Sequence, residues 1–192
     1  MSEATAVRVG TDPNGRPILM TRYQRRWWRR VVTRLGFTPT IVQGAWMVKA
    51  GGGAPDSAGY HDGGGCLDIR VWDLTADQQQ SLVRVVRDMG AGGWIRDREH
   101  GGMDPHFHLV LGSDSGLSAG ARAQWQDYIN NFDGLASRGP DYHWRPNPLV
   151  TTPPPSARKT RQAVQDAIDE AARIGLPVAD KLRNIKDRIR RW

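Results

Sequence analysis

Two short segments of the chain contain residue types that can do chemistry together. The first, SAGYHDGGGCLD, carries His61 and Asp68, and the second, MDPHFHLVL, carries His106 and His108. A hydrolytic zinc site needs three protein ligands with nitrogen or oxygen donors and an open position for water. His61, Asp68 and one histidine of the HxH pair supply such a set. The sequence therefore predicts a metal-dependent hydrolase with Zn²⁺ as its cofactor.

Strand periodicity predicts that these ligands converge. In a strand over 66–72, alternate side chains point to opposite faces, which places Asp68 on the face away from the core. The same alternation over 106–111 places His106 and His108 together on one face. If the two strands are antiparallel neighbours, Asp68 and His108 meet at one metal. The residues expected to face the core are Leu67, Ile69, Val71, Phe107, Leu109 and Leu111.

The loop before the first strand is expected to bring His61 to the same metal. Its glycine run, 63–65, permits backbone conformations and close approaches that a side chain would prevent. Cys66 shares a face with Asp68 and is a rival ligand. Thiolate ligands are more usual in closed structural sites, so we interpret Cys66 as a small buried residue.

The remaining elements predict an α+β fold with a small antiparallel sheet, flanking helices and a C-terminal helical tail. Thr75 and Gln78 have the spacing of a capping box before a helix over 76–89. Ser118 is placed to cap a helix that ends near Asn131. The other expected elements are a helix over 22–35, an extended segment over 40–49 and a strand over 94–98. Polar residues near 96–100 are explained equally well by a loop.

The order of these motifs resembles a known family. HxxxxxxD followed by HxH is similar to the zinc peptidases of the lysostaphin, D-alanyl-D-alanine peptidase and hedgehog superfamily. Peptidase domains of actinobacterial and actinophage cell-wall lysins are the closer resemblance. Their QG segment, SAGTHDGGGALD-like stretch and PHIH-like strand resemble residues 43–44, 57–68 and 105–108 here, and LSAGARAQWQDYINNFDGLA resembles the helix and turn that follow. The resemblance covers residues 38–146.

This resemblance implies cleavage of stem peptides in peptidoglycan, at D-alanyl or L-alanyl-D-glutamate linkages. It implies His61, Asp68 and His108 as the metal ligands, with His106 as the alternative third ligand. It also implies that Gln43 binds substrate, although a place at the edge of the sheet explains Gln43 as well.

The catalytic base is the point at which the sequence departs from its relatives. An ExxH or DxxH spacing is common there, but Pro105 precedes His108 by three residues and Met103 precedes His106 by three. We expect His106 or Asp104 to act as the base and to stabilise the transition state. Asp104 is also explained as a turn residue, since it precedes a proline.

Composition and charge suggest one domain with appendages. The expected parts are a basic, aromatic segment with a helix (1–37), a zinc peptidase-like domain (38–146), a proline-rich linker (147–156) and a basic helical tail (157–192). The net charge of +7 favours an anionic partner. A wall polymer or a membrane surface is expected, and nucleic acid is the least expected. A single cysteine excludes an intrachain disulfide.

Apolar residues recur at helical spacing in two segments, and each pattern predicts how the helix packs. Tyr23, Trp27, Val31 and Leu35 recur every four residues, which is typical of a helix that packs its aromatic side on a core. In the tail, apolar residues recur at alternating four- and three-residue steps, as in a coiled coil, with a break at Pro177. We expect the tail to self-associate or to dock onto a virion, and the alternative is binding to a wall or membrane.

The sequence also bears on where the protein acts and on an alternative function. The sequence has neither the pattern of a signal peptide nor an apolar run that could span a bilayer. We therefore expect the host cytoplasm before release, or a phage virion. The missing ExxH or DxxH base and the heptad tail favour an alternative, a non-catalytic structural or wall-binding virion component that retains the peptidase fold.

Overall fold

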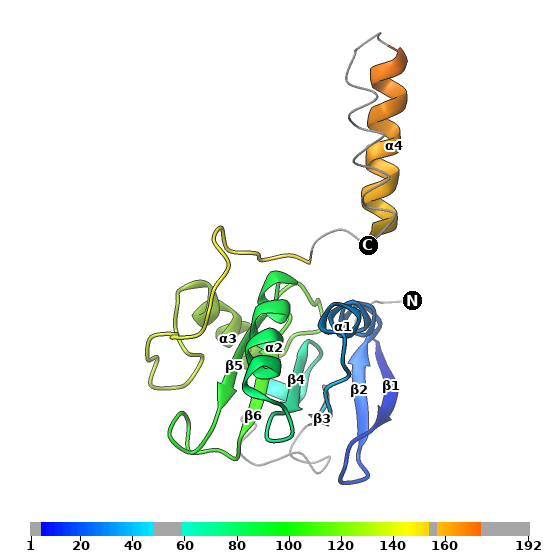
Figure 1. Cartoon of the computed structure of the whole chain (residues 1–192). Helices are drawn as coiled ribbons and strands as arrows, with labels where there is room; N and C mark the ends of the chain where they lie inside the picture. Colours follow the sequence, from blue (N-terminus) through cyan, green and yellow to red (C-terminus); the bar gives the residue numbers. More distant parts are fainter. Residues whose placement is uncertain (1–4, 48–58, 154–156, 174–192) are drawn as a thin grey trace. The chain divides into compact units, whose positions relative to one another are not determined.

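The computed structural model describes residues 5–47, 59–153 and 157–173. The chain divides into two units, Met1–Pro153 and Pro154–Trp192, which are described separately. The larger unit combines helices with small antiparallel sheets, which confirms the expected α+β class (Figure 1). Its elements are β1 (Ala6–Thr11), β2 (Pro17–Thr21), α1 (Arg22–Leu35), β3 (Ile41–Gln43), β4 (Cys66–Arg70), α2 (Ala76–Asp88), β5 (Gly92–Arg96), β6 (His106–Val110) and α3 (Ala119–Ile129). The smaller unit contains α4 (Ala157–Arg173).

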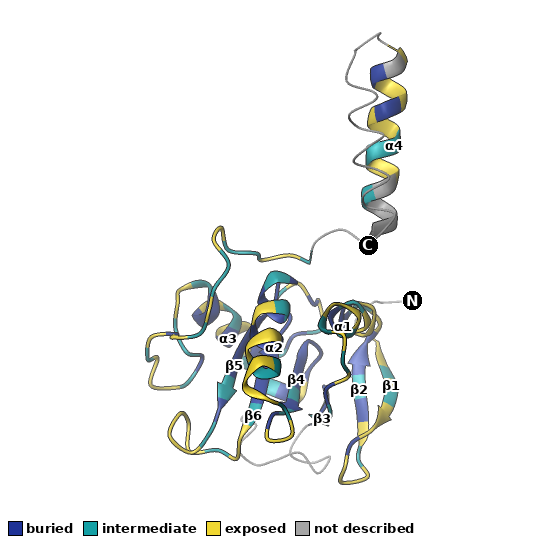
Figure 2. Ribbon diagram, in the orientation of Figure 1, coloured by how far each residue is buried: buried dark blue, intermediate teal, exposed yellow. Residues whose placement is uncertain are grey.

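The central sheet has the strand order β3-β4-β6-β5, and every neighbouring pair is antiparallel. The predicted pairing of the two ligand-bearing strands is confirmed, because β4 lies directly beside β6. All six residues expected to face the core are buried in one cluster. Figure 2 shows the resulting band of buried residues along these strands. Period-two alternation thus sorted the two faces correctly.

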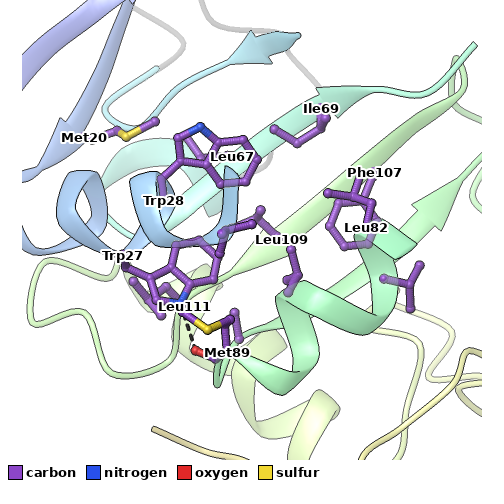
Figure 3. Packing of buried hydrophobic residues seen from close by; sticks show 14 of the residues in the cluster. Met20, Trp27, Trp28, Leu67, Ile69, Leu82, Met89, Phe107, Leu109 and Leu111 are labelled. Atoms are coloured by element: carbon purple, nitrogen blue, oxygen red, sulfur yellow. Dashed lines mark hydrogen bonds between the residues drawn. The ribbon is translucent and has the colours of Figure 1, made fainter. Parts of the chain in front are cut away.

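Helices α1 and α2 cover the core-facing side of the sheet (Figure 3). Thr21 caps α1 by accepting a hydrogen bond from the amide of Gln24. Trp27 and Val31 of the expected stripe are buried in the main cluster, which confirms the core-packing interpretation. The indole Nε1–H of Trp27 also donates to the carbonyl of Met89 at 2.8 Å, so the buried ring leaves no polar atom unpaired.

Helix α3 covers one end of the opposite face. Ser118 caps it by accepting from the amide of Ala121, and the capping box of α2 at Thr75 and Gln78 is also present. Ala121 and Tyr128 pack there against Trp94 and Val110 in a second cluster. Among the described residues, Asp68, His106 and His108 on this face line a cleft.

The described residues 5–37 belong to the larger unit and pack into its core. Sequence reasoning missed the hairpin β1–β2. Asp12 Oδ1 accepts hydrogen bonds from the amides of Asn14 and Arg16 and so stabilises the turn. Ile18 and Met20 of β2 alternate into the main cluster, which joins the hairpin to the core.

The proline-rich segment 147–156 is divided between the two units. Residues 147–153 belong to the larger unit. Leu149 packs against the second cluster, and the backbone of Thr152 lies so close to Gly90 that a Cβ at Gly90 would collide with it. These contacts fix the first half of the segment that composition alone assigned to a linker.

Helix α4 contains the first part of the expected tail. Ile168 and Ala171 of its apolar stripe are buried. The rest of the tail, including Pro177, lies outside the described residues. No helix in the described part of the chain is both long and apolar enough to cross a membrane.

Candidate metal centre

Three predicted ligands meet at one point on the open face of the sheet. Ligand atoms of His61, Asp68 and His108 all lie within 4.8 Å of one another. Asp68 Oδ1 is 2.7 Å from His108 Nδ1 and 3.3 Å from His61 Nε2. The two histidine nitrogens are 3.4 Å apart. The cluster can hold a metal ion.

Strand register and a tight loop produce this convergence. Asp68 of β4 lies directly opposite His108 of β6. His61 belongs to the short 3-10 helix η3 (Tyr60–Asp62) that precedes β4. The glycine run then passes closely beneath the loop after β6, where a Cβ at Gly63 would collide with the carbonyl oxygen of Gly116. The expected need for glycine in this loop is confirmed.

A hydrogen bond orients each ligand histidine. His61 Nδ1 lies 2.8 Å from the carbonyl oxygen of Gly44, which can only accept, so Nδ1 carries the proton. His108 Nε2 lies 2.8 Å from Gln124 Oε1. The Gln124 amide is itself oriented, because its Nε2 donates to the carbonyl of Gly134 at 3.1 Å. His108 therefore carries its proton on Nε2.

These tautomers leave only lone pairs at the centre. His61 Nε2 and His108 Nδ1 both point at the Asp68 carboxylate, without a hydrogen between them when the rings are neutral. Three acceptors at these distances repel one another unless a cation lies among them. A proton on His61 or a metal ion removes that repulsion. Ligand histidines in metal sites typically donate their other ring N–H in the same way.

The titration behaviour of the cluster fits a cation site. Burial disfavours ionisation of Asp68, but the charge of protonated His61 outweighs burial and holds the pKa of Asp68 well below its usual range. Burial alone would lower the pKa of His61, yet the Asp68 carboxylate outweighs it and raises that pKa. Burial lowers the pKa of His108, which favours its neutral form. Asp68 is therefore ionised, and neutral His108 has a lone pair on Nδ1 that can bind a metal ion.

Cys66 is fully buried in the second hydrophobic cluster, as expected, and it does not belong to the ligand cluster. Burial raises the pKa of its thiol well above the usual value, so the thiol stays protonated. A protonated thiol is a poor metal ligand.

His106 and Asp104 lie beside the cluster but outside it. His106 Nε2 is 3.9 Å from Asp68 Oδ1, and its Nδ1 donates to the main-chain carbonyl of Asp104 at 2.7 Å. The geometry thus includes His108, and not His106, among the three converging residues. The Asp104 side chain is 86% exposed, and its carboxylate pairs with Arg98 at 3.3 Å.

A cleft of about 1100 Å³ opens over the cluster. All three ligands line it, so the space beside the metal position is accessible to substrate and water. Gln43 of β3 also lines the cleft and lies opposite Asp68 in the strand register. The cleft wall includes the loop before β6 and residues around Gly134.

Sequence reasoning missed the residues that support the ligands. Trp94 of β5 lies opposite His108 in the register and stacks on its ring, with centroids 6.4 Å apart at 15°. Gln124 shares the buried side of α3 with Ala121 and Tyr128. A glutamine at helical spacing between core residues was a signal that could have identified this support.

Arg96 is a second missed residue. It ends β5, is 3% exposed and lines the cleft, so a loop does not explain it. Its guanidinium lies over the Trp94 ring, 5.1 Å from the ring centre. Burial lowers the pKa of Arg96 to about 10, so the group remains charged at neutral pH.

No family model, curated protein or solved structure matches the chain.

Proposed function

We propose that the protein is a zinc-dependent peptidase that hydrolyses amide bonds in peptidoglycan stem peptides. The supporting observation is the convergence of His61 Nε2, His108 Nδ1 and Asp68 Oδ1 as three lone-pair donors beneath an open cleft. Two imidazoles and one carboxylate with an open side form a donor set typical of hydrolytic zinc sites, whereas closed structural sites are richer in thiolates.

We assign proton transfer and the positioning of the base to residues of the chain. A zinc ion in this site would supply a Lewis acid for the scissile carbonyl and make water more acidic near neutral pH. His106 is the proposed base: its Nδ1–H is held by Asp104 O, so Nε2 is the free acceptor and faces the ligand cluster. Asp104 acts on this proposal as a positioning residue through its main chain.

Gln43 is the proposed contact for the substrate backbone. It lies beside Asp68 on the neighbouring strand and lines the cleft, so its amide group can offer both a donor and an acceptor to a peptide.

The substrate class comes from the sequence resemblance to cell-wall lysins, which indicates D-alanyl or L-alanyl-D-glutamate linkages. The net charge of +7 supports an anionic wall or membrane surface as a partner. We propose that the enzyme acts as a free lysin, held in the host cytoplasm before release, or as a component of the virion.

One observation favours a second candidate, a non-catalytic wall-binding or structural virion component that keeps the metal. Asp104 is the carboxylate that the sequence suggests as a base, but its side chain is exposed and paired with Arg98. A site that relies on His106 alone for proton transfer has fewer groups to assist departure of the amine.

Zinc content and peptide release separate these candidates. We would compare wild type, His108→Ala and, as a matched control, His100→Ala, which alters an exposed histidine outside the cleft lining. Digests of actinobacterial peptidoglycan would be examined by mass spectrometry for new peptide termini. The peptidase requires about one zinc per chain and new termini in wild type and the control, with both lost in His108→Ala. Zinc without new termini would support the binding component, and absence of zinc would refute both.

A further inference from the structure

Arg96 is a buried cation in the cleft wall, and no ion pair within 4 Å joins it to a described carboxylate. It is 3% exposed, and its Nη2 has no hydrogen-bond partner among the residues that the structure describes. Leaving a buried polar group unpaired is costly, and more so for a charged group. Nη2 lies close to Gly134, where a Cβ would come within 3.3 Å of it, so the position of the group is constrained.

The other arginines of the cleft differ from Arg96 in this respect. Within the described lining, Arg16 pairs with Asp12 at 2.6 Å and Arg70 pairs with Asp73 at 2.6 Å. Both are also more exposed than Arg96, so water can solvate them. Arg96 is therefore the cleft arginine best placed to receive an anion from outside the chain.

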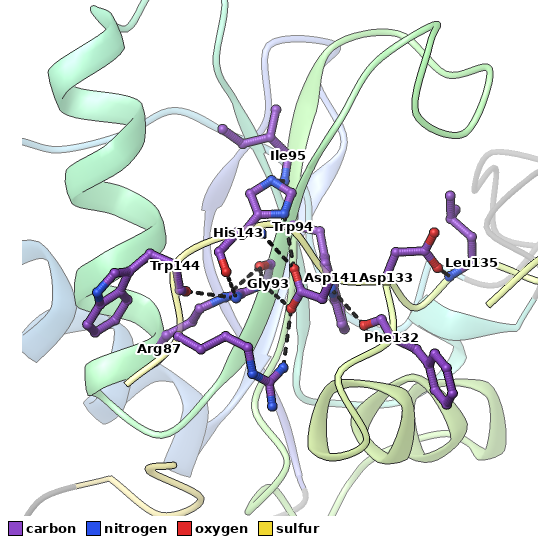
Figure 4. A network of polar contacts seen from close by, with 11 residues as sticks. Arg87, Gly93, Trp94, Ile95, Phe132, Asp133, Leu135, Asp141, His143 and Trp144 are labelled. Carbon is purple, nitrogen blue, oxygen red and sulfur yellow. Dashed lines mark hydrogen bonds and ion pairs between the residues drawn. The ribbon is translucent and has the colours of Figure 1, made fainter. Parts of the chain in front are cut away.

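Asp133 and Asp141, two carboxylates that act on Arg96, are hydrogen-bonded to other groups (Figure 4). Asp133 and Asp141 act on Arg96 electrostatically, but neither is hydrogen-bonded to it. Asp133 accepts from the amide of Leu135 at 2.9 Å. Asp141 forms a fully buried ion pair with Arg87 at 2.8 Å. Both carboxylates thus stabilise the charge of Arg96 through space, while Nη2 keeps its N–H groups for another acceptor.

The sheet places Arg96 one row from the metal centre. Trp94 lies opposite His108, and Arg96 lies opposite His106. Two residues along a strand correspond to about 7 Å. Consecutive residues of a peptide are about 3.8 Å apart, so a carboxylate one residue from the scissile bond can reach the guanidinium.

We propose that Arg96 binds a substrate carboxylate within one residue of the scissile bond and so restricts the enzyme to peptides that carry one there. A guanidinium offers a planar fork that matches a carboxylate in two parallel hydrogen bonds. Trp94 holds the fork from one side through its ring face. This specificity role rests on the proposed peptidase function, which it deepens by naming the charge next to the scissile bond.

Acid and amide forms of one peptide test the role directly. The probes are N-acetyl-L-alanyl-D-glutamate and N-acetyl-D-alanyl-D-alanine, each with all of its carboxyl groups free or all of them amidated. We expect zinc-loaded wild type to cleave an acid form with a kcat/KM about 10- to 100-fold above that of its amide. Arg96→Gln should remove this preference by slowing cleavage of the acid alone, with zinc content unchanged. Arg96→Lys should keep part of it.

Arg70→Gln is the matched control, because Arg70 occupies the same row on β4 but already has a partner. It should leave the acid-to-amide ratio unchanged. Equal cleavage of acid and amide by wild type would overturn the proposal. An equal loss on both forms in Arg96→Gln would also overturn it, because that result assigns Arg96 to the transition state.

Binding distinguishes failure of this inference from failure of the peptidase function. If zinc-loaded wild type cleaves none of the probes, calorimetry with the same acids and amides measures their affinities. A preference of about tenfold or more for the acid that Arg96→Gln abolishes would support Arg96 as the carboxylate site of a binding protein. Equal affinities would refute the role of Arg96.

Discussion

In each histidine of the cluster, one ring nitrogen lies within hydrogen-bond distance of an acceptor and the other faces Asp68. Gly44 supplies the acceptor for His61, and Gln124 supplies it for His108. Gln124 lies on α3, whereas His108 lies on β6, and the Gln124 amide is itself held by a hydrogen bond to the carbonyl of Gly134. Metal affinity should therefore depend on a residue that does not touch the metal.

Gln124→Ala is expected to weaken zinc binding by about 10- to 100-fold, because His108 loses the acceptor that holds its ring and tautomer. Competition with a chromogenic chelator measures this affinity. Gln126→Ala is the matched control, since Gln126 is an exposed glutamine on the same helix. Equal affinities in the two variants would show that Gln124 does not orient the ligand.

Acid should displace the metal through His61. Its pKa is raised above the usual value in the metal-free protein, so a proton competes for Nε2 as the pH falls. Below that pKa, apparent zinc affinity should drop about tenfold per pH unit for each proton displaced. Chelator competition between about pH 8 and pH 5.5 tests this expectation. A flat profile would contradict the assignment of His61 as a ligand.

At the scale of elements, the edge strand β5 is held by the segment that follows α3 (Figure 4). Arg87 of α2 donates to the carbonyl of Gly93 at 2.7 Å and to Asp141 at 2.8 Å. The amide of Ile95 donates to His143 Nε2 at 3.2 Å. These hydrogen bonds pair backbone groups on the edge of the sheet that β5 would otherwise leave without partners. It also fixes the strand that carries Trp94 and Arg96.

Asp141→Asn should destabilise the fold by about 3–5 kcal/mol, because it leaves the buried Arg87 without its counterion. Urea unfolding measures the change. Asp88→Asn serves as the control: it removes a partly exposed pair with Arg34 at 3.0 Å and should cost no more than about 1 kcal/mol. A similar cost for both variants would mean that burial of the Arg87–Asp141 pair contributes little.

At the scale of the whole molecule, the metal centre and the tail belong to different units. The cleft and all three ligands lie in Met1–Pro153, whereas α4 lies in Pro154–Trp192. A chain that ends at Pro153 should therefore bind as much zinc per chain as the full-length protein.

The same truncation tests the role of the tail. Its apolar stripe includes Val164, Ile168 and Ala171, and such spacing favours helix pairing. We expect the full-length chain to self-associate and the truncated chain to be monomeric in sedimentation experiments. Equal masses would leave virion docking or surface binding as the roles proposed for the tail.

Local patterns in the sequence were sufficient for the elements and for the candidate ligands. The alternation of apolar residues along β4 and β6 placed Asp68 and His108 on one face, and capping residues marked the starts of α2 and α3. Such signals depend on neighbours a few residues apart, because backbone geometry repeats over that range. The hairpin β1–β2 was missed, although the turn residues Asp12 and Gly15 signalled it locally.

Contacts between distant segments were decided by the tertiary structure alone. Strand register aligned Asp68 with His108 rather than His106, and the docking of α3 supplied Gln124. Burial of Arg96 without a partner likewise depends on how β5 meets its surroundings. Local periodicity was enough to show which side chains of a strand lie on the same face. Only packing decided which of them meet, because register and docking are set by the fit of whole surfaces rather than by local periodicity.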